Sequence, residues 1–236
     1  LVRHIRCSNK LIYMLDDTDT AKIPFKKTNF VFVTGLNFRG ISHIKKYLPD
    51  IRAYFTPIKK HRINIDKLIK SARADCDVLI GIHIRAGDYA QHSGGNFYFD
   101  TKYYVDFMRQ TLSLFPNQRV GFLVCSNGDL QHEKFAEFNY WFGNNDYIED
   151  MYSFAQCDYI LGPPSTYTLW ACLYGDVPLC FVQHSNEKIS LNKFQDYFAH
   201  VGKKEALTCS LGEQYVKING ERYDIQFKTN KLYLEI

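Results

Sequence analysis

The stretch Val78-Leu79-Ile80-Gly81-Ile82-His83-Ile84-Arg85-Ala86-Gly87-Asp88-Tyr89 decides the fold class of this chain. An apolar run rich in β-branched residues ends abruptly in polar and charged residues. Such a run is typical of a strand that is buried on both faces, as in a parallel α/β sheet. Because side chains alternate along a strand, we expect His83 and Arg85 to share one face and Ile82 and Ile84 the other.

Arg85 would then stand at the carboxyl end of a parallel strand, beside the ring of His83. Open α/β sheets bind their ligands at this edge. A planar guanidinium can hold a phosphate through two parallel charge-assisted hydrogen bonds. The stretch therefore predicts an anion site, although charged residues also occur wherever a strand simply runs out into solvent.

A second segment, residues 158–168, also predicts an anion site. Residues 158–161 read as a short apolar strand, residues 162–168 as a turn rich in hydroxyl groups, and a helix is expected from Leu169. A tight turn between a strand and a helix is a recurrent anion site, because free backbone N–H groups and the positive end of the helix dipole meet there. Ser165 or Thr166 would alternatively serve only to cap the helix.

A third strand, over residues 121–125, ends in Ser126 and Asn127. A parallel arrangement would direct both side chains at the same crevice, whereas the following Gly128 equally suits a plain β-turn.

Strands and helices alternate along the middle of the chain, which predicts a doubly wound, Rossmann-like parallel sheet. Helices are expected at residues 41–54, 58–73 and 101–115, the last with Asp100 as its N-cap, and a further buried strand at 178–182. Beyond residue 207 polar and apolar residues alternate around Asn219-Gly220, which predicts a small antiparallel appendage. We therefore expect an amino-terminal region over residues 1–74, a ligand-binding domain over 75–206 and the appendage over 207–236.

Composition narrows the classes of function. A chain of 236 residues with 46% hydrophobic residues can bury a substantial core, and its net charge of +4 is too small and scattered to predict nucleic-acid binding. The seven cysteines form no Cys-x-x-Cys pair, so neither a zinc site nor a disulfide framework is expected. Free buried thiols predict a reducing, cytoplasmic location. The apolar runs are too short to span a bilayer, so any membrane association would be peripheral.

The order His83-x-Arg85-x-Gly87-Asp88 resembles the His-x-Arg-x-x-Asp signature of the fucosyltransferases that form α1,2 and α1,6 linkages and of the protein O-fucosyltransferases. The resemblance implies a GT-B-type fold and a phosphate-binding role for Arg85 on the β-phosphate of GDP-fucose. Many members carry a second arginine where this chain has Ala86. Family members also carry a Gly-Asn-Gln motif that this sequence lacks, so we expect that the amino-terminal part of the enzyme is missing. The resemblance implies that residues 1–74 are the remainder of an acceptor-side α/β region and that residues 75–206 bind the nucleotide sugar.

The resemblance extends to the turn at residues 162–168, where it implies contacts between the nucleotide phosphates and Ser165, Thr166 and Tyr167. Asp150 is a candidate partner for the N1 and N2 donors of guanine, or alternatively a helix-capping residue. Asp88 would orient Arg85, and His83 would contact the nucleotide or organise the loop.

The function implied is metal-independent transfer of fucose from GDP-fucose to the hydroxyl of a glycan acceptor, with inversion. No cofactor or metal is expected, because Arg85 and helix dipoles would neutralise the departing diphosphate. The pairs Asp75-x-Asp77 and Asp17-x-Asp19 have the residue types of the metal-binding Asp-x-Asp pattern of other glycosyltransferases. Neither pair lies where the resemblance places the donor site. A non-catalytic nucleotide-sugar or glycan-binding module, or a transferase for another nucleotide sugar, remain the alternatives.

Overall fold

The computed structural model describes residues 2–6, 13–14, 30–34, 38–39, 41–90, 95–144, 146–202, 215–218, 221–228 and 231–234, and the side chains of residues 41–201 with the same gaps and without positions 42 and 88. The chain divides into two compact units. One consists of Pro57–Glu213, and the other combines Leu1–Thr56 with Gln214–Ile236.

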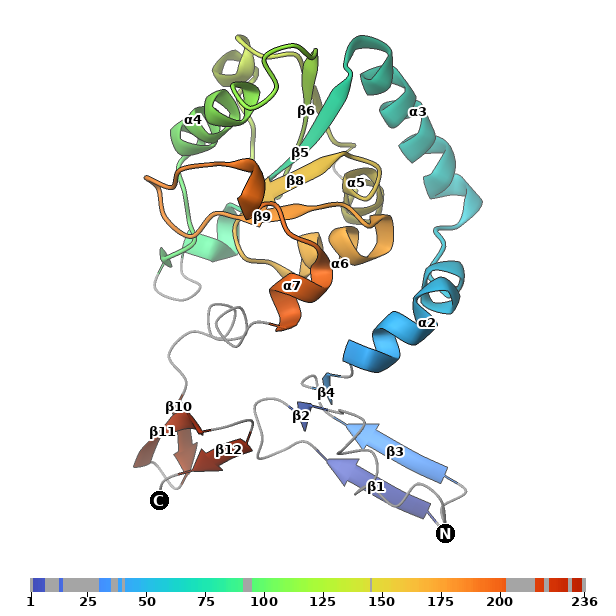
Figure 1. Ribbon diagram of the computed structural model, residues 1–236, viewed down its shortest axis with the longest axis vertical. Coiled ribbons are helices and arrows are strands. Elements are labelled where there is room, and N and C mark those ends of the chain that lie inside the picture. Colours follow the sequence, from blue (N-terminus) through green and yellow to red (C-terminus); the bar gives the residue numbers. More distant parts are fainter. Residues whose placement is uncertain are drawn as a thin grey trace. The chain divides into compact units, whose positions relative to one another are not determined.

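A parallel sheet of five strands forms the centre of the larger unit (Figure 1). Its spatial order is β7-β6-β5-β8-β9, so the apolar run Val78–Ile84 forms the central strand. The strands are β5 (Val78–Ile84), β6 (Val120–Ser126), β7 (Tyr140–Phe142), β8 (Tyr159–Gly162) and β9 (Leu179–Phe181). All seven residues of β5 are buried. The predicted parallel α/β sheet is confirmed.

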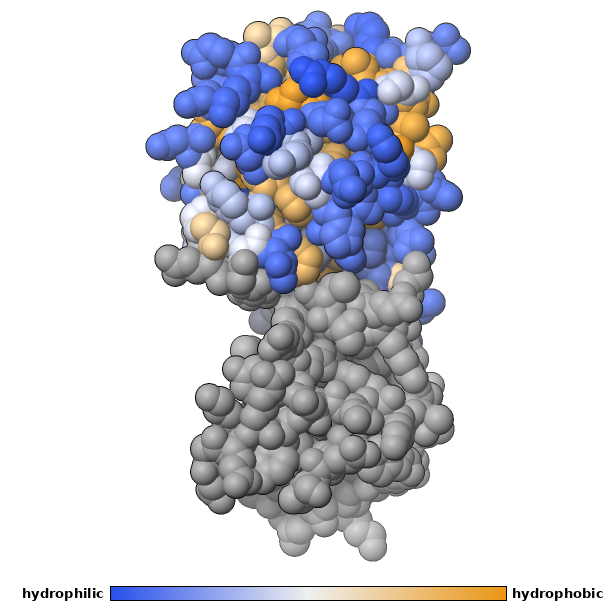
Figure 2. Space-filling view, turned by 90° about the vertical axis from the view of Figure 1, so that its left-hand side faces the viewer, coloured by the Kyte–Doolittle hydropathy of each residue, from blue (hydrophilic) through white to orange (hydrophobic). Residues whose placement is uncertain are grey.

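Helices cover both faces of this sheet (Figure 1), which makes it doubly wound as predicted. They are α3 (Lys59–Asp75), α4 (Thr101–Leu112), α5 (Tyr147–Phe154) and α6 (Thr166–Gly175), followed by the short α7 (Tyr197–Gly202). Ile80, Ile82 and Ile84 pack with the apolar side of α4. Leu79, on the opposite face, packs with α3, α5 and α6. The side of the unit on which α4 lies is mostly hydrophilic at its surface (Figure 2).

Local capping decides where the helices begin. The side chain of Asp100 accepts a hydrogen bond from the Lys102 N–H at 2.9 Å, as predicted for the start of α4. Asp146 caps α5, which therefore begins before the acidic pair at 149–150. Ser165 caps α6, so this helix starts at Thr166 rather than at Leu169.

The larger unit begins at Pro57 because α3 belongs to it. Ile65, Ile69 and Ala72 of α3 are buried against the sheet. All but the last residue of this helix lies within the expected amino-terminal region, residues 1–74, and the assignment of that region stays a prediction.

The order of the strands creates a crevice at the centre of the sheet. From β5 the chain moves to β6 and β7 on one side, then crosses to β8 and β9 on the other. The connections that leave β5 and β8 therefore diverge, and ligands bind at such a switch point in open α/β sheets.

The second unit holds two small parallel strand pairs and a helix. They are β1 (Val2–Arg6) with β3 (Phe30–Thr34), β2 (Tyr13–Met14) with β4 (Phe38–Arg39), and α2 (Ile41–Tyr54). Three antiparallel strands follow near the carboxyl terminus: β10 (Tyr215–Ile218), β11 (Glu221–Lys228) and β12 (Lys231–Leu234). The predicted turn at residues 219–220 lies outside the described residues. That these strands form a separate appendage stays a prediction.

None of the helices among the described residues is long and apolar enough to cross a membrane. The five cysteines that the structure describes, at 76, 125, 157, 172 and 180, are buried and form no disulfide.

Gly81 tests how closely α5 packs on the central strand. A Cβ atom at this position would lie 2.5 Å from Cδ1 of Phe154, so we expect Gly81→Ala to lower the free energy of unfolding by about 1–3 kcal/mol. Urea denaturation measures the loss. In a Phe154→Leu background the added methyl group has more space. The losses in free energy of unfolding caused by the two substitutions should therefore be less than additive. Fully additive losses would contradict this packing.

Candidate functional site

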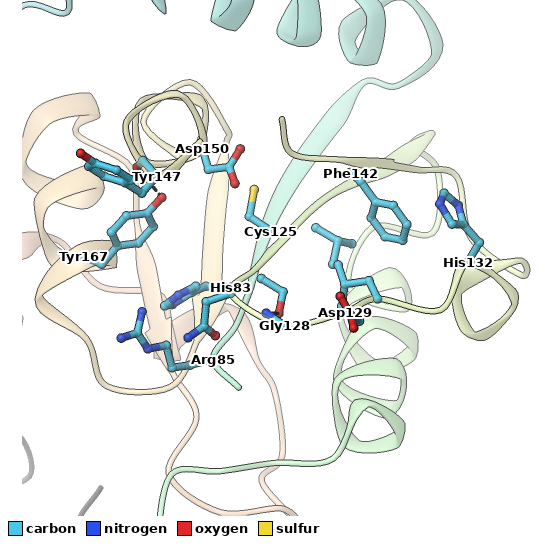
Figure 3. Close-up of a pocket in the computed structure, with 14 residues that line it drawn as sticks. His83, Arg85, Cys125, Gly128, Asp129, His132, Phe142, Tyr147, Asp150 and Tyr167 are labelled. Atoms are coloured by element: carbon cyan, nitrogen blue, oxygen red, sulfur yellow. Dashed lines mark hydrogen bonds between the residues drawn. The ribbon is translucent and has the colours of Figure 1, made fainter. Parts of the chain in front are cut away.

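A cavity of about 740 Å³ opens at the carboxyl ends of β5 and β6, beside the amino termini of α5 and α6 (Figure 3). Side chains from both strand ends, both helices and the segments around β7 surround it. The lining residues are His83, Arg85, Val124, Cys125, Ser126, Asn127, Gly128, Asp129, Leu130, His132, Phe142, Tyr147, Asp150 and Tyr167. Six of the residues predicted for the site are therefore brought together: His83, Arg85, Ser126, Asn127, Asp150 and Tyr167.

Arg85 lies where the strand pattern placed it, just beyond the end of β5. Its guanidinium carbon is 5.2 Å from the centre of the Tyr89 ring. The Tyr89 hydroxyl donates a hydrogen bond to the carbonyl oxygen of Pro164 at 2.8 Å. Tyr89 thus joins the loop that carries Arg85 to the turn that precedes α6, and the two sequence motifs lie side by side.

His83 is buried beneath this loop, with 4% of its surface exposed. Its ring centre lies 5.2 Å from that of Tyr167 and 6.0 Å from that of Phe154. Burial, and secondarily the charge of Arg85, lower the pKa of His83 to about 3. The imidazole is therefore neutral near pH 7, and its Nδ1 has no hydrogen-bond partner among the described residues.

Asn127 holds the backbone of the Arg85 loop. Its Oδ1 accepts a hydrogen bond from the Ala86 N–H at 2.7 Å, and its Nδ2 donates to the Ala86 carbonyl at 3.4 Å. The Ser126 hydroxyl accepts from the Gly128 N–H at 3.0 Å. Both residues thus have structural contacts, and a direct ligand contact and the alternative of a plain β-turn both stay predictions.

The three predicted residues at the start of α6 differ in position. The Ser165 hydroxyl accepts a hydrogen bond from the Tyr167 N–H at 3.2 Å and so caps the helix. Thr166 is exposed, and neither residue lines the cavity. Tyr167 does line it, and its hydroxyl donates to the Tyr147 carbonyl at 2.7 Å. A phosphate contact by Ser165 or Thr166 stays a prediction, and the side chain of Asp88 lies outside the described residues.

Asp150 presents a buried carboxyl group to the same cavity, with 5% of its surface exposed. One oxygen accepts a hydrogen bond from the Asn144 N–H at 2.8 Å. Burial, reinforced by the neighbouring charges of Asp146 and Glu149, raises the pKa of Asp150 to about 6. The carboxyl group is mostly ionised at neutral pH but titrates within the physiological range.

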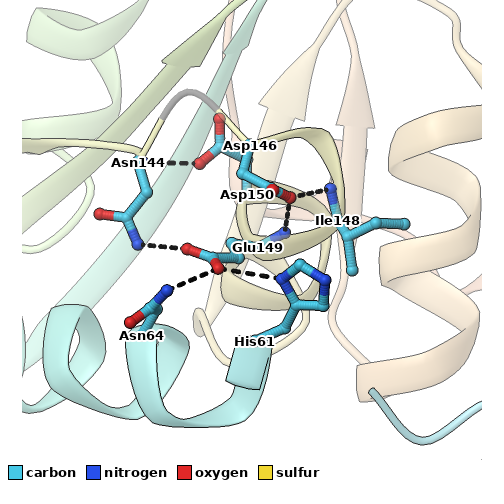
Figure 4. A network of polar contacts seen from close by, with 7 residues as sticks. All are labelled: His61, Asn64, Asn144, Asp146, Ile148, Glu149 and Asp150. Carbon is cyan, nitrogen blue, oxygen red and sulfur yellow. Dashed lines mark hydrogen bonds and ion pairs between the residues drawn. The ribbon is translucent and has the colours of Figure 1, made fainter. Parts of the chain in front are cut away.

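A polar network behind Asp150 fixes the first turn of α5 (Figure 4). Oε1 of Glu149 receives hydrogen bonds from Asn64 Nδ2 at 2.7 Å and from His61 Nδ1, which is 2.9 Å away. The other Glu149 oxygen accepts from Asn144 Nδ2 at 3.0 Å. Asp146 accepts from the N–H groups of Ile148 and Glu149.

Among the described residues, one group of potential metal ligands lies close together, and its members are engaged in other contacts. Donor atoms of His61, Asp146 and Glu149 lie within 4.8 Å of one another, but the carboxylates already accept the hydrogen bonds of the network. Asp77 pairs with Arg119 at the amino-terminal ends of β5 and β6, opposite the cavity. The Asp17-x-Asp19 pair lies outside the described residues.

The two helix termini at the cavity carry opposite electrostatic character. The first turn of α5 holds the carboxylates of Glu149 and Asp150 behind the anionic cap Asp146, which offset the positive end of its dipole. The first turn of α6 has no acidic residue and a neutral cap, Ser165. The edge near Arg85 and α6 therefore favours an anion, and the edge near Asp150 favours hydrogen-bond donors.

Eight of the fourteen lining residues were not predicted from the sequence, and three of them carry rings: His132, Phe142 and Tyr147. His132 and Phe142 pack edge to face at its far side, with ring centres 4.4 Å apart, and Tyr147 begins α5 (Figure 3). The signal for Tyr147 was Asp146, a typical N-cap residue directly before it. Phe142 ends the strand β7, whose three residues Tyr140-Trp141-Phe142 are too few to show a pattern.

The chain matches no family model and no curated protein. Among solved structures it is similar to a mutant of Arabidopsis thaliana FUT1 in complex with GDP, with 12% sequence identity and a TM-score of 0.47. The match covers 83% of this chain and 54% of that chain, so this chain spans about half of the length of FUT1. At this identity and score, the likeness assigns neither a family nor an activity.

The bond between Asn127 and Ala86 should contribute measurably to stability. Asn127→Ala leaves the Ala86 N–H without its partner, so we expect the free energy of unfolding to fall by about 1 kcal/mol. Asn117→Ala, which removes an exposed amide, is the matched control and should have little effect. Equal urea midpoints for the two variants would contradict a positioning role of Asn127.

Proposed function

We propose that this chain is the donor-binding part of a glycosyltransferase that takes fucose from GDP-fucose. The observation that carries the proposal is the placement of Arg85 at the carboxyl end of the central strand, at the edge of a 740 Å³ cavity and next to the start of α6. The resemblance of the His83-x-Arg85-x-Gly87-Asp88 motif to the fucosyltransferase signature supports the choice of donor.

The polarity of the cavity suits a nucleoside diphosphate. The diphosphate would bind at the edge formed by Arg85 and the neutral cap of α6, where a guanidinium and a helix amino terminus both favour negative charge. The base would extend towards Asp150, whose carboxylate accepts hydrogen bonds from the N1 and N2 donors of guanine. The cavity volume lies within the range of about 300–1,000 Å³ that is usual for such ligands.

The chemical step follows from this placement. A hydroxyl group of the acceptor attacks the anomeric carbon from the face opposite the leaving group, and the bond to the β-phosphate oxygen breaks, so the configuration inverts. Negative charge grows on the β-phosphate, and Arg85 stabilises it. The hydroxyl proton leaves to solvent or to an acceptor-side base. Arg85 supplies the positive charge that a metal provides in other transferases.

His83 and Asp88 take supporting roles in this proposal. A neutral imidazole beneath Arg85 adds no competing charge, and it can donate a hydrogen bond to the nucleotide or keep the loop in place. Asp88 would orient Arg85.

A different nucleotide sugar is the second candidate, because Ala86 stands where many fucosyltransferases have another arginine. Thermal shifts with GDP, UDP and TDP rank the donors, since a ligand raises the unfolding temperature according to its affinity. A module that only binds nucleotide sugars would show GDP affinity without transfer or hydrolysis of labelled GDP-fucose.

Replacing Arg85 tests the phosphate role. Arg85→Ala removes charge-assisted hydrogen bonds, so we expect GDP to bind about tenfold to a hundredfold more weakly in calorimetry. Arg85→Lys keeps the charge but loses the bidentate geometry, so its GDP affinity should lie between those of the wild type and Arg85→Ala. Arg62→Ala, an exposed arginine on α3, is the control. GDP affinity equal to wild type in Arg85→Ala would refute the role.

Acidification tests the role of Asp150. Because the pKa of Asp150 is raised to about 6, the carboxylate that accepts from guanine is present above that pH and is lost below it. Between pH 8 and pH 5 GDP affinity should fall about tenfold through this group alone. Asp150→Asn cannot titrate, so it separates this effect from ionisation of the phosphates themselves. If GDP affinity depends on pH in the same way in the wild type and in Asp150→Asn, Asp150 does not contact the base.

A further inference from the structure

The helix α3 carries the net positive charge of the chain. It holds six basic and two acidic residues, so its net charge of +4 equals that of the whole chain. The basic and acidic residues outside this helix therefore balance one another. Composition alone suggests a scattered charge, but the positive charge is concentrated on one element, where it attracts anions more strongly than the same charge spread over the molecule.

One face of α3 is buried and the opposite face is exposed. Ile65, Ile69 and Ala72 pack against the sheet. The residues opposite them recur at intervals of four, four and three, so they lie along one line of the helix surface. They are all exposed, and we call them the basic stripe: Lys59, Ile63, Lys67 and Lys70. The stripe is about 17 Å long and follows the outer side of α3, at the margin of the larger unit (Figure 1).

The cations of the basic stripe are available to an external partner. None of its three lysines forms an ion pair with a carboxylate of the residues that the structure describes, whereas Arg73 of the same helix pairs with Asp158. Two further exposed cations, Lys60 and Arg62, flank the stripe. Asp66 is the acidic residue of α3 that lies beside it, so the surface stays strongly positive.

Apolar side chains are exposed among these cations. Ile63 lies within the basic stripe and is 56% exposed, and Ile58, directly before α3, is 66% exposed. An isoleucine side chain gains free energy when it leaves water for an apolar layer. The alkyl chains of lysines can lie along the same layer while their ammonium groups stay among polar headgroups.

This combination distinguishes between two kinds of polyanion. A nucleic acid would use the cations but not the isoleucines, and α3 has no aromatic side chain on which bases could stack. The surface of a membrane with anionic lipids uses both, because the headgroups attract lysines and the acyl boundary accepts apolar side chains. The charge and the exposed isoleucines together therefore favour a membrane.

We propose that the basic stripe of α3 binds the surface of a membrane that contains anionic lipids. The lysine ammonium groups lie against lipid phosphates, and Ile58 and Ile63 enter the boundary between headgroups and acyl chains. Salt weakens the electrostatic part of this attraction. The inference uses no residue of the nucleotide cavity, so it does not depend on the proposed function.

Co-sedimentation of the intact chain with lipid vesicles tests the inference. We expect binding to vesicles of equal parts phosphatidylcholine and phosphatidylglycerol, and none to vesicles of phosphatidylcholine alone. The double variant Lys67→Gln/Lys70→Gln should partition about thirtyfold more weakly. Lys134→Gln/Lys188→Gln is the matched control, because it removes the same charge from exposed lysines outside α3, and it should bind nearly like the wild type.

The variant Ile63→Gln tests the apolar contribution, because it keeps the charge and suits a helix. It should weaken vesicle binding about threefold to tenfold. This loss should depend little on salt concentration, whereas the effect of the lysine variant should shrink as salt is added. All substituted side chains are exposed, so circular dichroism should show wild-type helix content in every variant.

No binding to the anionic vesicles, equal binding to both kinds of vesicle, or wild-type partitioning of Lys67→Gln/Lys70→Gln would overturn the inference. So would tighter binding of the chain to duplex DNA or to polyglutamate than to the anionic vesicles, because the basic stripe would then serve a soluble polyanion. Calorimetry with GDP separates these results from the proposed function. The stripe variants should keep wild-type GDP affinity, and vesicle binding without GDP binding would contradict the donor site alone.

Discussion

Burial of the central strand on both faces is the constraint on which the rest of the molecule depends. Every residue of β5 is buried, with α4 on one face and α3, α5 and α6 on the other. Polar side chains are costly within such a strand unless they are satisfied, so its charged residue emerges only at the end. Arg85 thus reaches solvent where the connections from β5 and β8 diverge and where the helices begin.

Several contacts hold the loop that carries Arg85 and the helix that carries Asp150 in place. Tyr89 ties the loop to the turn before α6, and Asn127 holds the Ala86 backbone from the neighbouring strand. The network around Glu149 fixes α5 and with it Asp150. These contacts hold the cationic and the acidic edges of the cavity apart, which reduces the reorganisation that binding of a nucleotide would require.

An element could be predicted from the sequence where a pattern of a few residues is compatible with only one local structure. The apolar run of β5 and the Asp100 cap were predictable because burial and capping act over a few residues. The strand β7 was missed because three residues carry no period. The bond from Asn127 to Ala86 joins residues that are far apart in sequence, so no local pattern records it.

The central claim is that the guanidinium of Arg85 receives the diphosphate of the donor. A crystal structure of the protein with GDP tests it most directly. The account predicts β-phosphate oxygens at about 2.7–3.2 Å from the Arg85 nitrogens, with the base directed towards Asp150. A diphosphate bound elsewhere, with Arg85 turned away from it, would contradict the account.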